Sequence, residues 1–104
     1  MNRSSSPPKD LSREARKLWA RLFDAADIDP VAEILLDTLC RSWDRLQQAR
    51  ELLAKEGIVV QEKTAHGGMK ARAHPAVLVE HNAAATLCRC WRLLGFDQAP
   101  PEGL

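Results

Sequence analysis

The chain has 104 residues, of which 45% are hydrophobic and 28% are charged. This length suits one domain, and the composition excludes a wholly disordered chain and a collagen-like one. No apolar run approaches the roughly 20 residues that a membrane-spanning helix needs, and residues 1–8 lack the apolar segment of a secretory signal. We therefore expect one small domain that stays where it is made and has no membrane partner.

The charges are segregated along the chain, although the net charge is only +1. Residues 1–23 carry six basic and two acidic side chains, residues 24–62 carry four basic and nine acidic ones, and residues 63–94 carry five basic and one acidic. Such blocks can steer a polyanion to one face, pair one subunit with another, or form a solvated surface. The composition leaves these three alternatives open.

The chain contains three cysteines, Cys40, Cys88 and Cys90. Their odd number and their spacing fit neither a disulfide framework nor a CxxC motif. We therefore expect reduced, packed thiols in a cytosolic protein.

Residues 1–10 are rich in serine, proline and charge, which predicts a flexible arm. A single helical domain is expected over residues 11–97, and Ser12 is a good N-cap for its first helix. The apolar residues that follow recur at helical spacing, and they are Ala15, Leu18, Trp19, Leu22, Phe23 and Ala26. The other face of this helix is basic and carries Arg13, Arg16, Lys17 and Arg21.

A second, long helix is predicted from Asp29-Pro30, because an N-cap followed by proline favours a helix start, to the natural breaker Gly57. Its apolar seam follows a 3-4 spacing and consists of Leu36, Leu39, Trp43, Leu46 and Leu53. So long a helix with so regular a seam usually packs along another long helix. Since one short domain offers few candidates, we expect the chain to form an oligomer.

Residues 58–60 favour β structure and residues 65–69 are turn-like, which predicts a short β-hairpin or ordered loop over residues 58–73. His74-Pro75 then opens a third helix, which carries Leu87 and Trp91 on its apolar side and ends at Gly95. Residues 98–104 read as a flexible tail. The predicted fold class is mainly α, with three helices and a hairpin or loop between the second and the third.

The sequence offers no convincing catalytic or metal-binding set. It has no GxxxxGK[ST] nucleotide loop, and its histidines, His66, His74 and His81, lack a second group of ligands at metal spacing. His74 is explained by its place before a helix-opening proline. We expect no catalytic residue, no metal and no cofactor, although a small nuclease that uses His74 and His81 is an alternative.

Five segments of the chain form an ordered series of motifs. They are Leu11-Ser12-Arg13-Glu14-Ala15-Arg16-Lys17-Leu18-Trp19, Leu36-x-x-Leu39-Cys40, Ala49-Arg50-Glu51-Leu52-Leu53-x-x-Glu56-Gly57-Ile58-Val59-Val60, Lys70-x-x-x-His74-Pro75-Ala76 and Leu93-Leu94-Gly95-Phe96-Asp97. In this order and spacing they resemble the P27 family of phage terminase small subunits, over roughly residues 11–97. The His-Pro helix start and the terminal Leu-Gly are the most telling motifs.

The resemblance implies a non-catalytic component of phage DNA packaging. Small terminase subunits typically assemble into rings, bind viral double-stranded DNA, and present it to a large subunit that carries the ATPase and the nuclease. A protein of this kind would come from a phage or prophage and act in the cytoplasm of the bacterial host. The alternative is a structural oligomerisation or adaptor protein that does not bind DNA.

The resemblance and the charge pattern together suggest two sets of site residues. Phosphate contacts are expected from Arg13, Arg16, Lys17, Arg21, Lys63, Lys70 and Arg72. The subunit interface is expected to contain Leu36, Leu39, Trp43, Leu46, Leu53, Leu87 and Trp91. A helix-turn-helix at the junction of the first two helices is a further alternative, but the second helix begins with acidic residues, which suit phosphates poorly.

Overall fold

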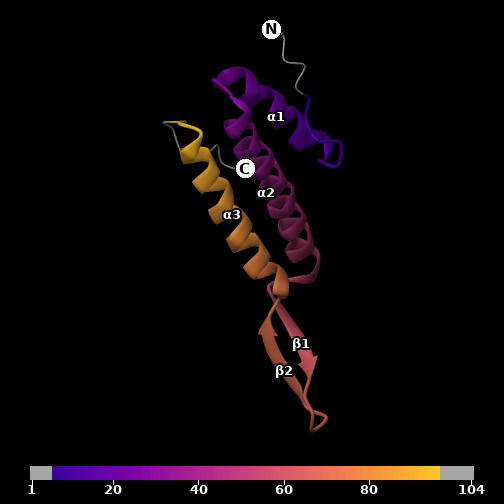
Figure 1. Ribbon diagram of the computed structural model, residues 1–104. Helices are drawn as coiled ribbons and strands as arrows, with labels where there is room; N and C mark the ends of the chain where they lie inside the picture. The colour runs from indigo at the N-terminus through magenta and orange to yellow at the C-terminus, as the bar shows by residue number, and fades with distance from the viewer. Residues whose placement is uncertain (1–5, 97–104) are drawn as a thin grey trace.

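A computed structural model describes residues 6–96 of the chain (Figure 1). The elements follow in the order α1 (Arg13–Ala25), α2 (Pro30–Glu56), β1 (Val59–Lys63), β2 (Met69–Ala73) and α3 (Pro75–Leu93). The molecule is elongated, with extents of 66 × 27 × 21 Å. The prediction of three helices with a hairpin between the second and the third is confirmed.

The helices begin and end where local chemistry favours it. Ser12 caps α1, since its hydroxyl accepts a hydrogen bond from the backbone N–H of Ala15 at 3.0 Å. Asp29 caps α2 in the same way, through the N–H of Ala32 at 2.7 Å. At the other end of α2, Gly57 has a φ of 79°, a backbone conformation that side chains disfavour. The helices therefore begin and end at the residues that the sequence predicts as caps and breakers.

The core lies where α1 and α3 pack against α2. It is formed by apolar side chains from all three helices and from the segment before α1, and its buried members are Leu11, Ala15, Trp19, Leu22, Leu36, Leu39, Cys40, Leu46, Ala83, Leu87, Cys90 and Trp91. Full burial of one leucine side chain contributes about 1.5–3 kcal/mol to folding stability relative to leaving it exposed. The apolar stripes of the three helices thus close on one another within a single chain.

This packing places most of the residues expected at a subunit interface inside one chain. Five of them are buried in the core, namely Leu36, Leu39, Leu46, Leu87 and Trp91, while Trp43 and Leu53 are half-buried. Of the expected interface residues, only Trp43 and Leu53 keep part of their surface accessible to a second copy. Assembly itself stays a prediction.

The hairpin projects beyond the helices, at the end of the molecule away from α1 (Figure 1). Its strands pair in antiparallel register, with Val59 opposite Ala73 and Lys63 opposite Met69. At the tip, the N–H of Thr64 donates to the carbonyl of Gly68 at 2.8 Å, and Gly67 has a φ of 84°. Among the strand residues only Val60 is half-buried, and all the others are exposed.

One residue joins the hairpin to the helices. The backbone N–H of His74 donates to the carbonyl of Ile58 at 2.8 Å, which closes the base of the hairpin. Its ring nitrogen Nδ1 accepts from the N–H of Ala76 at 3.0 Å and so caps α3. The proton therefore sits on Nε2, which lies 2.9 Å from a carboxylate oxygen of Glu56 and donates to it.

The ends of the chain were predicted to be a flexible arm over residues 1–10 and a flexible tail over residues 98–104. Residues 1–5 and the whole tail lie outside the described residues. Within residues 6–10, the side chain of Asp10 forms an ion pair with Arg41 of α2. Among residues 6–96, no helix is long and apolar enough to cross a membrane.

Candidate nucleic-acid interface

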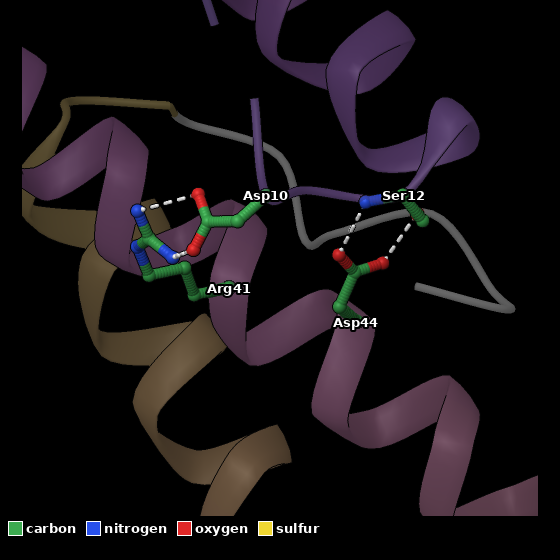
Figure 2. Close-up of polar contacts among 4 residues, drawn as sticks. All are labelled: Asp10, Ser12, Arg41 and Asp44. Carbon is green, nitrogen blue, oxygen red and sulfur yellow. Dashed lines mark hydrogen bonds and ion pairs between the residues drawn. The ribbon is translucent and has the colours of Figure 1, made fainter. Parts of the chain in front are cut away.

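The basic helix α1 is fastened to α2 at its N-terminal end by two pairs of side chains (Figure 2). The backbone N–H of Ser12 donates to Asp44 at 2.8 Å, and the Ser12 hydroxyl donates to the other oxygen of the same carboxylate. Beside this pair, the guanidinium of Arg41 binds both oxygens of Asp10. The start of α1 therefore has a fixed position on α2.

The middle of α1 is held by a tryptophan. Trp19 is only 2% exposed, and its indole Nε1–H donates to a carboxylate oxygen of Asp37 at 2.7 Å. Its ring stacks on Phe23 with a centroid separation of 4.9 Å. Because the buried face and the start of α1 are both held, its opposite face has a defined orientation toward solvent.

That opposite face carries the four cations predicted from the sequence, Arg13, Arg16, Lys17 and Arg21, and all four are exposed. Within residues 6–96, none of the four forms an ion pair. Like charges four residues apart repel each other, and cations in the first turns of a helix oppose its macrodipole, so this arrangement costs stability. A bound polyanion would offset that cost, because its phosphates would neutralise the cations and would interact favourably with the positive end of the helix dipole.

The hairpin cations are arranged differently. The register places Lys70 directly opposite Glu62, and Glu62 also forms an ion pair with Arg72 at 3.4 Å. Side chains alternate between the two faces of a strand, so Lys63 lies on the face opposite to these three residues. The Glu62 carboxylate thus offsets part of the positive charge of Lys70 and Arg72 on one face of the hairpin. The other face of the strands has one cation, Lys63.

The structure separates the seven predicted phosphate-binding residues into two groups. Four lie together on α1, and three lie on the hairpin at the other end of the molecule (Figure 1). The position of the Glu62 carboxylate beside the hairpin cations is not apparent from the sequence. The alternation of Glu62 and Lys63 hinted that they lie on different faces, but the partner of Glu62 depends on the register.

Arg41 is a cation that is engaged within the chain. Its hydrogen bonds hold the pKa of the Asp10 carboxyl below its usual range, and the same contact raises the pKa of Arg41. This pair fixes the start of α1 on α2. The start of α2 suits phosphate poorly, since it carries the cap Asp29 and the first-turn Glu33.

The histidines do not assemble a metal site in the part of the chain that the structure describes. Both ring nitrogens of His74 are engaged in hydrogen bonds, while His66 and His81 are exposed on different elements. Among residues 6–96, no group of three or more His, Cys, Asp or Glu side chains could hold a metal ion. His74 has a structural role at the junction of the hairpin and α3.

A family model described as "Phage terminase, small subunit" matches residues 14–100. The chain belongs to this family. The match includes all three helices and the hairpin, apart from the first residue of α1. No curated protein and no solved structure gives a match to the chain. This terminase small subunit therefore has a role in phage packaging, and its assignment to the P27 group stays a prediction from the motifs.

Proposed function

We propose that this terminase small subunit binds viral double-stranded DNA through α1 and presents it to the large terminase subunit. The observation that carries the proposal is the stripe of four exposed cations on α1, which form no ion pair within residues 6–96 and stand on a helix whose other face is fixed to α2. Within a family that serves phage packaging, the polyanion at hand is the genome.

The contact would be made to phosphates. Arginine and lysine side chains at four-residue spacing follow one face of a helix and can reach successive phosphates of a duplex. Neutralising each phosphate releases counterions, so the affinity depends steeply on salt and little on base sequence. The hairpin would add a weaker contact through Lys63, Lys70 and Arg72, because Glu62 opposes two of these cations.

Self-assembly completes the proposal. A ring of copies would present the α1 stripe many times, and repeated weak contacts raise avidity without any new chemistry. The small subunit would act in the cytoplasm of the bacterial host as a non-catalytic partner, while the large subunit supplies the ATPase and the nuclease.

The test is to titrate the purified chain into a fluorescently labelled duplex and to measure anisotropy between about 50 and 200 mM salt. Native mass spectrometry on the same samples reports the number of copies with and without DNA. We expect an oligomer that takes up DNA, with an affinity that falls steeply with salt while the oligomer persists. An oligomer that takes up no duplex at any salt concentration would contradict DNA binding and favour the adaptor alternative.

A further inference from the structure

α2 exposes a second stripe on the side away from the core. Its residues alternate in steps of three and four, which places them in one line along the helix, and they are Val31, Ile34, Thr38, Arg41, Arg45, Gln48 and Leu52. The apolar members lie at the two ends, where Val31 is 70% exposed, Ile34 67% and Leu52 39%. The stripe is therefore left uncovered by the chain itself, and it carries exposed apolar side chains at both ends with polar and charged ones between them.

Two adjoining hollows between α2 and α3 extend this stripe into a groove. They share Arg45 and Val79 in their linings, and neither is lined by a residue of α1. Their walls are small at Ser42, Ala49 and Ala83, which leaves room for side chains from outside. Arg45, Leu52 and Val79 line the same hollow. Arg45 is exposed there and forms no ion pair within residues 6–96.

Another side of α2 has the complementary character. There, the start of α1 and the second half of α2 line a hollow that contains the exposed carboxylates of Glu14 and Glu51 and the half-buried ring of Trp43. Within the described chain, neither carboxylate forms an ion pair. One molecule therefore has a basic groove with apolar borders and an acidic surface with an aromatic centre.

We propose that the Arg45 groove of one copy receives the Glu51 surface of the next copy. Arg45 then pairs with Glu51 of that copy, and the apolar side chains of Leu52 and Val79 pack near its Trp43. The contact joins two different surfaces of the same chain, which adjoin at Gln48 of α2, so it is heterologous and each copy can bind two neighbours. This inference rests on the proposed self-assembly and names the surfaces that produce it.

The two surfaces face different directions around α2. At about 100° per residue, the side chains of Arg45 and Glu51 point in directions about 120° apart around α2. Copies joined through surfaces at such an angle turn progressively, and a heterologous contact that turns can close into a ring. DNA is a poorer occupant of the groove, because phosphates would leave Leu52 and Val79 uncovered.

Charge reversal tests the pairing directly. The variants are Arg45→Glu, Glu51→Arg and the double variant with both changes, each measured by light scattering and native mass spectrometry over a range of concentrations. Each single reversal puts like charges in contact, and we expect association to weaken about tenfold or more. The double variant restores opposite charges at every contact, so it should assemble like the wild type.

Lys17→Glu is the matched control, since it makes the same charge change as Arg45→Glu on the exposed face of α1, outside both surfaces. It should assemble normally and bind DNA less well. Circular dichroism should show unchanged helix content for every variant, because the substituted side chains are exposed.

The outcomes separate the inference from the proposed function. If the single variants assemble like the wild type, or if the double variant does not regain assembly, the assigned surfaces are wrong. Self-assembly of the wild type would remain valid in either case. A wild-type monomer that binds DNA would overturn the inference and leave DNA binding intact. If Arg45→Glu weakens DNA binding without changing the mass, the groove contacts nucleic acid and the inference is wrong.

Discussion

α1 and the hairpin are both basic in sequence, yet the structure gives their cations different surroundings. The α1 cations stand on one exposed face without carboxylate partners among residues 6–96, and the helix beneath them is fixed by Asp44 and Asp37. The hairpin cations are divided between two faces, and Glu62 lies against two of them. Local net charge is therefore a weaker guide to a polyanion site than the partners that the fold gives each charge.

The largest difference should appear when cations are removed from α1. Each phosphate contact contributes roughly fivefold to affinity at physiological salt, so Arg16→Ala with Lys17→Ala should weaken duplex binding about 25-fold and flatten its salt dependence. The matched control is Arg89→Ala with Arg92→Ala, which removes two exposed cations from α3. Equal losses for the two pairs in fluorescence anisotropy would mean that only net charge matters, and the comparison would fail.

Removing Lys70 and Arg72 should have a smaller effect. Because Glu62 already offsets part of their charge, we expect Lys70→Ala with Arg72→Ala to weaken DNA binding by about fivefold or less and to leave assembly intact. Glu62→Gln should act in the opposite direction and strengthen binding by up to about fivefold, since it releases Arg72 from its ion pair. Unchanged affinity in both variants would remove the hairpin from the interface.

The docking of α1 can be weakened without touching a cation. Ser12→Ala removes the N-cap and one of the two hydrogen bonds to Asp44, so the free energy of unfolding in urea should fall by about 1–2 kcal/mol. Thr64→Ala is the hairpin counterpart, because it removes a hydroxyl that accepts from the N–H of Gly68 at 3.0 Å. That change should leave the unfolding transition unaltered, and an equal loss would show that the hairpin and α1 are equally coupled to the core.

A pH-dependent effect concerns Cys40, which is buried in the core beside α1. Burial, together with the carboxylates of Asp37 and Asp44, raises the pKa of this thiol from 9.0 to about 12. Between these values the folded chain holds a proton that the unfolded chain has lost, so stability should fall as the pH rises above about 9. Urea titrations at increasing pH measure this slope.

Alkylation of the thiols reports the same packing. Cys88 is exposed and should react first, while Cys40 should react only when the core opens. Ser12→Ala should accelerate the labelling of Cys40, and Thr64→Ala should not. Mass spectrometry of the labelled chain resolves the sites, and rapid labelling of Cys40 in the wild type would show that α1 is loosely held.

The helix boundaries could be predicted because they depend on local chemistry. The residues at the helix boundaries act on backbone groups only a few positions away, so their effect can be predicted from the sequence. They are Ser12, the Asp29-Pro30 pair, Gly57 and His74. The register of the hairpin cannot be predicted in the same way. It is set by the turn over residues 64–68, and only the register shows that Glu62 lies opposite Lys70.

The candidate surfaces were predicted in part. The basic stripe of α1 could be predicted because one helix carries all of it. The sequence predicts that the seam of α2 faces a neighbouring copy, because a long apolar stripe has the same pattern whether another chain or α1 and α3 cover it. The outer stripe that contains Arg45 and Leu52 has the same 3-4 spacing, but polar residues at its centre conceal it from a search for apolar repeats.

The closed base of the hairpin has a consequence for how this chain can vary. Because Ile58 and His74 are hydrogen-bonded to each other, and Glu56 contacts the His74 ring, α2 and α3 are joined over a short span before the strands begin. Residues 59–73 are therefore an insertion between two helices that are already connected. Length changes within this insertion would alter the reach of the molecule along its longest dimension while its three-helix body keeps its form.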